Sequence, residues 1–169
     1  MKLDKNIYSM RATKLAPYLL GKLLCRRTKE GVIRARICET ECYFGEEDTA
    51  CHAHKGKTPR TKTLYEEGGV AYVYLCYGIH SLLNVVSGER DFPEAVLIRG
   101  VEGAIGPGRV AKYMQIDRAL NEVSFVDSNE LWIEDDGYVC GEISLECRVG
   151  IDYASPEDRD RKWRFILDL

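Results

Sequence analysis

The stretch Glu39-Thr40-Glu41-Cys42-Tyr43 closes a run of residues with the pattern of a β-strand, and a long polar loop follows it. Side chains alternate across a strand with a period of two, so one face is predicted to carry Tyr43, Glu41, Glu39, Ile37, Ala35 and Ile33. The other face then carries Arg34 and Arg36. A carboxylate on an apolar, core-facing side is costly unless it is paired or used. We therefore expect the functional site to lie at this stretch.

The segments around this strand predict a mixed α/β fold. Residues 22–28 have a strand pattern, and the turn 29–31 leads into the strand 32–43. Further strands are predicted at 70–77, 80–87, 95–101, 131–134 and 143–149. Short helices are predicted at 13–20, with Thr13 as N-cap and Pro17 in the first turn, and at 60–67 and 109–114. Hairpin turns and the shortage of helical crossovers favour a curved, largely antiparallel sheet with flanking helices and a protruding hairpin.

The length and composition are typical of one soluble domain spanning residues 1–169. The chain has 45% hydrophobic and 30% charged residues. No apolar run approaches the roughly 18 residues that a membrane helix needs, and the first residues lack the apolar core of a signal peptide. We therefore expect a cytoplasmic protein without membrane contact, nucleoid-associated in a prokaryote or nuclear in a eukaryote.

Seven cysteines without a secretory signal indicate reduced thiols rather than a disulfide framework. No pair has the C-x-x-C spacing of structural zinc modules, so neither a metal nor another cofactor is predicted. The alternative is a zinc-dependent hydrolase that uses Cys38, Cys42, Cys51, His52 and His54.

The net charge of −3 argues against a generic basic nucleic-acid coat. It does not exclude DNA binding, because the distribution of charge matters more than its sum. A basic cluster follows the acidic strand and contains Lys55, Lys57, Arg60 and Lys62.

Three features indicate a pocket for a flat ligand: the acidic strand end, the loop that carries His52, and a tyrosine-rich hairpin. Glu41 is the candidate general base, and Arg99 ends a strand whose face is otherwise apolar. Two alternatives stay open for the acids. Glu41 could form a structural ion pair with Arg99, or Glu39 on the same face could be the base.

The order and spacing of the motifs resemble one enzyme family closely. The matching residues are Glu39-Thr40-Glu41-x-Tyr43, His52, Thr58-Pro59-Arg60, Tyr72-Val73-Tyr74-x-x-Tyr77-Gly78-Ile79, Asn84, Val96-Leu97-Ile98-Arg99, Gly106-Pro107-Gly108, Arg148-Val149-Gly150-Ile151 and Trp163-Arg164-Phe165. This set resembles the alkyladenine (methylpurine, or 3-methyladenine) DNA glycosylase family of the mammalian type, over nearly the whole chain.

The resemblance implies base flipping and hydrolytic excision of alkylated or deaminated purines from duplex DNA by a monomeric enzyme. The substrate class is that of 3-methyladenine, 7-methylguanine, hypoxanthine and ethenoadenine. It implies Glu41 as the base that activates water, with Arg99 beside it, and Tyr43, His52 and Tyr74 as an aromatic box. Asn84 would discriminate against normal guanine. A hairpin turn of residues 78–80 would place Tyr74 opposite Asn84, whereas a two-residue turn would place it opposite Leu83.

The resemblance also implies the contacts with DNA. Tyr77 at the hairpin tip would insert into the duplex, with Ile79 and His80 beside it. Lys57, Arg60 and Arg109 would contact the phosphate backbone. No lysine occupies a pocket position of the motif, so a monofunctional glycosylase that uses water is expected. The alternative function is a damaged-DNA or nucleotide-binding module that does not cleave.

Overall fold

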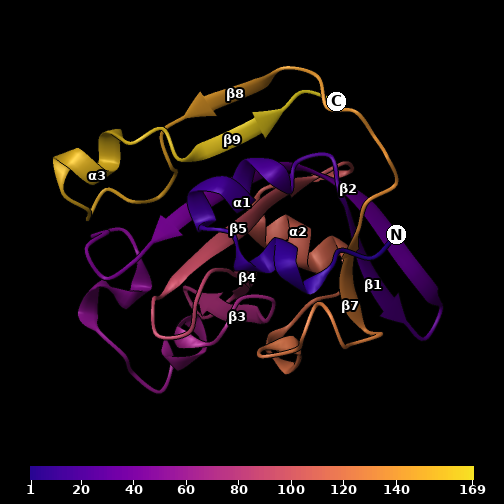
Figure 1. Cartoon of the computed structure of the whole chain (residues 1–169), viewed down its shortest axis with the longest axis horizontal. Helices are drawn as coiled ribbons and strands as arrows, with labels where there is room; N and C mark the ends of the chain where they lie inside the picture. The colour runs from indigo at the N-terminus through magenta and orange to yellow at the C-terminus, as the bar shows by residue number, and fades with distance from the viewer.

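The computed structural model describes residues 1–169, and its longest strand, β2 (Gly31–Phe44), is the axis of the sheet (Figure 1). The main path of this nine-stranded sheet has the order β3-β4-β5-β2-β1-β7, and every pairing is antiparallel. The strands of this path are β1 (Leu23–Thr28), β3 (Ala71–Cys76), β4 (His80–Val86), β5 (Glu94–Val101) and β7 (Leu131–Glu134). The predicted mixed α/β fold with a curved antiparallel sheet is confirmed.

Three further strands complete the sheet. The two-residue β6 (Ala104–Ile105) pairs with β5. The hairpin of β8 (Ile143–Glu146) and β9 (Arg164–Leu167) joins through β9, which pairs with residues 39–41 of β2. The C-terminal hairpin therefore lies beside the acidic part of β2, and the loop between β8 and β9 is brought to the site.

Short helices cover the sheet. They are α1 (Ala12–Tyr18), α2 (Pro107–Tyr113), α3 (Pro156–Asp160) and the 3-10 turns η1 (Lys5–Ser9), η2 (His52–Lys55), η3 (Lys62–Tyr65) and η4 (Arg118–Leu120). α1 lies across β2 and β5 in Figure 1, and its apolar side shares one hydrophobic core with α2 and the strands. Leu15, Leu19, Val110 and Met114 are completely buried there. This core packs against one face of β2 and β5.

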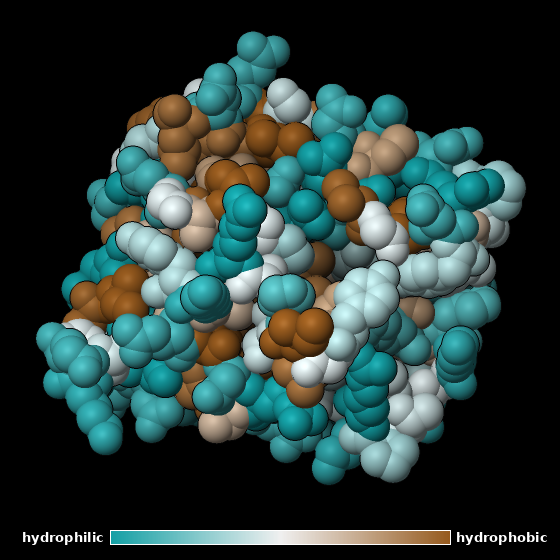
Figure 2. Space-filling view, turned by 180° about the vertical axis from the view of Figure 1, so that it is seen from behind, coloured by the Kyte–Doolittle hydropathy of each residue, from teal (hydrophilic) through white to brown (hydrophobic).

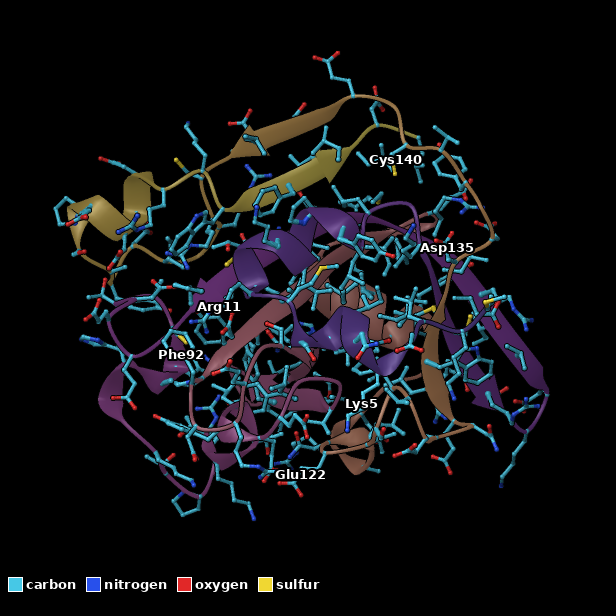
Figure 3. All side chains as sticks on the ribbon, in the orientation of Figure 1. Lys5, Arg11, Phe92, Glu122, Asp135 and Cys140 are labelled. Atoms are coloured by element: carbon cyan, nitrogen blue, oxygen red, sulfur yellow. The ribbon has the colours of Figure 1, made fainter.

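The start of α1 differs from the prediction. Arg11 takes the N-cap position, and the carboxylate of Glu94 accepts a hydrogen bond from the backbone N–H of Ala12. Thr13 is therefore not the N-cap. Arg11 also pairs with Glu94 at 2.8 Å and lies 4.4 Å above the ring of Phe92 (Figure 3). Pro17 is near the end of this seven-residue helix rather than in its first turn. The capping group comes from a strand distant in sequence, and local sequence rules do not reveal it.

The predicted alternation of β2 is wrong beyond Ile37. Regular pairing with β5 is interrupted between Ile37 and Thr40. Before this point the side chains of Ala35 and Ile37 belong to the core. After it, Cys42 belongs to the core, and the hydroxyl of Thr40 donates to the carbonyl of Ala16 in α1. Glu39, Glu41 and Tyr43 therefore lie on the face opposite to α1. The irregularity moves the two acids away from the apolar core and onto the opposite face of the sheet.

The β3–β4 hairpin turns over three residues, Tyr77 to Ile79. Cys76 pairs with His80 and Tyr74 with Leu82, so Asn84 lies opposite Tyr72. Neither register considered from the sequence is correct. Tyr77 and Gly78 both have positive φ, 53° and 67°. Two successive left-handed residues suit a tight turn and project the tip away from the sheet.

The surface seen from behind is mostly hydrophilic, and hydrophobic residues gather in a few patches (Figure 2). None of the helices has the length and apolar character that spanning a membrane requires.

Candidate active site

A cavity of about 420 Å³ opens on the face of the sheet opposite to α1. β2, β3, β4 and β5 each contribute lining residues, and the loops at 50–52 and 149–153 complete the wall. Seven of the residues predicted from sequence line this cavity: Tyr43, His52, Arg60, Tyr74, Tyr77, Asn84 and Arg99. Glu41 lies immediately behind the wall, and Lys57, Ile79, His80 and Arg109 lie outside it.

Glu41 has no exposed surface, and the residues around it hold its carboxylate in place. The hydroxyl of Tyr43 donates to Oε1 at 2.8 Å, and the backbone N–H of Val149 donates to Oε2 at 2.7 Å. Nε of Arg99 is 3.9 Å from Oε2. Tyr43, Val149 and Arg99 all line the cavity, so the carboxylate is separated from it by one layer of atoms.

The pKa of Glu41 is raised above its ordinary value, chiefly because burial disfavours the charged form. The donors from Val149 and Tyr43 and the charge of Arg99 act in the opposite direction. A raised pKa in a buried carboxylate beside a cavity is typical of a general base.

Glu39 has different partners. Nε of Arg99 donates to its Oε2 at 3.2 Å, and Nη1 of Arg164 donates to its Oε1 at 3.0 Å. Both carboxylate oxygens therefore face arginines. A structural ion pair with Arg99 was the alternative role for Glu41. In the structure, Glu39 forms that pair at 3.2 Å, and Glu41 makes only the longer contact of 3.9 Å to the same arginine.

A buried arginine of the motif, to which no role was assigned from the sequence, supports this arrangement. The side chain of Arg148 is completely buried and makes two hydrogen bonds to Asp48, at 2.6 and 3.0 Å. It also donates to the carbonyl of Cys42 at 2.9 Å and lies 4.9 Å from the ring of Tyr43. Arg148 thus ties its own loop, which continues into Val149, to β2 beside Glu41, and so helps to place the Val149 N–H against the carboxylate.

His52 and Tyr74 form one wall of the cavity. Their ring centroids are 4.4 Å apart at an interplanar angle of 66°, which leaves no room for a base between them. Tyr72 extends the wall, with its ring 5.3 Å from that of Tyr74 and its hydroxyl 3.1 Å from Nδ1 of His52. Tyr72 was not predicted as a site residue, although its spacing of two from Tyr74 places both on one face.

His52 is neutral at physiological pH. Burial, followed by the charge of Arg60, lowers its pKa to about 4. The wall that His52 makes with Tyr74 therefore carries no charge of its own, and His52 offers one donor and one acceptor nitrogen.

Asn84 lies at the floor of the cavity and is buried. Its Nδ2 donates to the carbonyl of Tyr72 at 3.2 Å, whereas its Oδ1 accepts no hydrogen bond from the protein. The amide is held by β3 and keeps a free acceptor for a ligand.

The remaining predicted residues lie at the surface. Tyr77 is 93% exposed and Ile79 75% exposed at the hairpin tip, and His80 is exposed next to Gly108 of α2. Lys57 lies 5.4 Å from the ring of Tyr65, and Arg109 is exposed in α2. Arg60 is exposed as well, but its guanidinium lies 5.3 Å above the ring of Tyr74 and its side chain lines the cavity.

No three His, Cys, Asp or Glu side chains come together in a way that could hold a metal ion. The five residues of the zinc alternative therefore do not form a ligand set. All seven cysteines are free, and burial raises the pKa of Cys51, which lines the cavity, to about 12. Cys51 is a neutral thiol and a poor nucleophile.

Comparison with known proteins identifies the family. The model of the methylpurine-DNA glycosylase family matches residues 6–105 and 102–168. The chain belongs to this family. The residues matched include every side chain of the cavity, and the family is the one that the motifs resemble.

Relatives are similar over most of their length. A protein of Borrelia garinii is 39% identical, and the match covers 98% of this chain and 95% of that protein. A protein of Psychrobacter cryohalolentis is 44% identical, and the match covers 83% of this chain and 80% of that protein. An archaeal protein of Methanocella arvoryzae is 40% identical over 96% and 90%. Each is described as a "putative 3-methyladenine DNA glycosylase". All three are prokaryotic, so the expected mammalian type finds no support in these relatives.

Proposed function

We propose that this protein is a monofunctional DNA glycosylase that hydrolyses the N-glycosidic bond of damaged purines in duplex DNA. The observation that carries the proposal is a fully buried carboxylate, Glu41, held one layer behind an aromatic cavity of about 420 Å³. Family membership and the relatives' descriptions support the reaction.

In the proposed mechanism, Glu41 activates the attacking water. Each of its oxygens accepts one hydrogen bond from the protein and keeps a further lone pair for a proton. Arg99, which lines the cavity 3.9 Å away, would hold the water against the base. Bond cleavage develops positive charge on the sugar, and the ionised Glu41 would stabilise that charge.

The cavity would hold the base outside the duplex. The wall of His52 and Tyr74 offers aromatic surface to one side of a purine, and Tyr43 on β2 would offer the other. Asn84, whose Oδ1 lacks a partner, would meet the purine edge and oppose the exocyclic amino group of normal guanine. Because no lysine lines the cavity, water rather than a protein amine would attack the sugar.

The exposed hairpin tip supports the proposed contact with duplex DNA. Tyr77, with Ile79 and His80 beside it, would fill the gap left by the flipped nucleotide. Lys57 and Arg109, exposed and without acidic partners, would contact phosphates. The protein would act as a cytoplasmic monomer. A non-cleaving recognition module is the second candidate, but a base-like carboxylate behind the cavity favours catalysis.

The test is a single-turnover assay with duplexes that contain 1,N6-ethenoadenine, hypoxanthine or 7-methylguanine. The expected products are the free base and an intact strand with an abasic site, separated by chromatography. Tight binding of the lesion duplexes without release of any base would instead support the recognition module, and strand cleavage would contradict the monofunctional mechanism.

Replacing Tyr77 with alanine should weaken lesion binding and slow base release about tenfold or more, because an inserted side chain offsets part of the unstacking cost of a few kcal/mol. Since Tyr77 is 93% exposed, the free energy of unfolding should stay within about 0.5 kcal/mol of wild type. Single-turnover rates and urea unfolding measure the two quantities. Equal release rates in both proteins would exclude Tyr77 as the inserting residue.

The pH dependence of release should reflect Glu41. The base works only when ionised, so the rate should fall as the pH drops through its raised pKa. The hydroxyl of Tyr43 lowers that pKa, so Tyr43→Phe should move the acidic limb to higher pH. A 7-methylguanine duplex is the suitable substrate because its base is already cationic. A limb that moves with His52→Gln and not with Tyr43→Phe would contradict this assignment.

A further inference from the structure

The charge lining the base cavity is entirely positive. Arg60 and Arg99 are the charged side chains in its wall, and no aspartate or glutamate lines it. Arg99 is balanced by Glu39 at 3.2 Å. Arg60 makes no ion pair, and its Nη2 atom reaches only the carbonyl of Leu75, at 3.4 Å. The wall of the cavity thus carries one positive charge without an acidic partner, on an exposed side chain.

That charge lies against the aromatic wall of the cavity. The guanidinium is 5.3 Å from the ring centroid of Tyr74, and its charge contributes to the lowered pKa of His52 in the same wall. Arg60 also lines a neighbouring cavity of about 700 Å³, so its side chain stands at the boundary of the two spaces. It occupies the aromatic surface in the way a cationic ligand would.

We propose that Arg60 is a specificity-determining residue that disfavours cationic alkylpurines relative to neutral purines of the same shape. This inference rests on the proposed function, because it assumes that the cavity receives a purine. A cationic purine on Tyr74 competes with the guanidinium for the same ring and is repelled by it. A neutral purine is not repelled, and its carbonyl or ring nitrogen can accept from one of the five guanidinium N–H donors.

The test compares two duplexes whose central base differs in charge but hardly in shape: 7-methylguanine, which is cationic, and 7-methyl-7-deazaguanine, which is neutral. Affinities are measured with a Glu41→Gln protein, so that no base is lost. Replacing Arg60 with glutamine should raise the preference for the cationic base on the order of tenfold, as expected for one unit charge several ångströms away in a partly solvated site. Arg60→Lys, which keeps the charge, should give a smaller change.

Lys57→Gln is the matched control, because it removes one positive charge nearby without altering the cavity wall. Lys57→Gln should weaken the binding of both duplexes by the same factor. If Arg60→Gln also weakens the binding of both duplexes by the same factor and lowers the salt dependence of binding, Arg60 contacts a phosphate and the inference is overturned. Failure of the proposed function would appear differently, as absence of base release by the wild-type protein with every lesion.

Discussion

Replacing Glu41 with glutamine is expected to lower the single-turnover rate of base release by about 10²–10⁴-fold, the contribution typical of a positioned general base. Glutamine keeps the size of the side chain, and its Oε1 can still accept from either Tyr43 or Val149. It cannot take a proton from water or balance positive charge on the sugar. The measurement is release of 1,N6-ethenoadenine or hypoxanthine under enzyme excess.

Glu39→Gln is the matched control for that variant. Glu39 lies two residues away on the same face, but its carboxylate is bound to Arg99 and Arg164. Its replacement should disturb Arg99 and slow release by roughly tenfold, well short of the loss at Glu41. If Glu39→Gln abolished base release and Glu41→Gln retained full activity, the roles of the two acids would have to be exchanged.

The largest effect on stability is expected at Arg148. Replacing it with methionine leaves Asp48 buried without its partner and removes the donor to the carbonyl of Cys42. Breaking a buried pair in this way costs about 3–5 kcal/mol of the free energy of unfolding. Urea denaturation followed by tryptophan fluorescence measures it, with the midpoint moving to lower urea at an unchanged slope.

Arg161→Met is the control for Arg148. Both guanidiniums lie over the ring of Trp163, Arg148 at 5.1 Å and Arg161 at 4.8 Å from its centroid. Arg161 also pairs with acids, Glu157 and Asp158, but its side chain is 39% exposed. Removing a partly exposed pair should cost about 0–1 kcal/mol. Equal losses at both positions would show that packing on Trp163, rather than the pair with Asp48, accounts for the contribution of Arg148.

These two predictions concern one arrangement, because Arg148 precedes the residue whose N–H holds Glu41. Loss of the pair between Arg148 and Asp48 should therefore affect the proposed base, Glu41, as well as the fold. In surviving folded Arg148→Met protein, release should be slower than in the Arg161→Met control.

The sequence predicted most of the strands because their patterns are local, whereas β9 was not predicted and β8 ends at Glu146, before the predicted end at residue 149. β1, β5 and β7 agree with the expected segments to within a residue at either end, since period-two patterns and turn residues depend on near neighbours. The motif resemblance likewise named Tyr43, His52, Tyr74, Asn84 and Arg99, which the structure brings to one cavity.

What the sequence missed depends on pairs distant in the chain. The irregularity in β2 moves Glu39 and Glu41 to the cavity face, and the sequence around them contains no glycine or proline to mark it. A hint lies in the partner strand: a Cβ at Gly100 would come within 3.1 Å of Cβ of Glu39. A glycine inside a strand pattern indicates such a close approach only once the pairing is known.

By itself, then, the sequence determined most of the antiparallel strands, the hairpin with its exposed tyrosine, and most of the polar and aromatic side chains that line the cavity. The tertiary structure decided how those side chains are used. It paired Glu39 with two arginines, held Glu41 by a hydroxyl and a backbone N–H, buried Arg148 against Asp48, and placed Arg60 over Tyr74. The physical reason is that burial and partners fix a side chain's charge and role, and these depend on residues up to 125 positions apart in the chain.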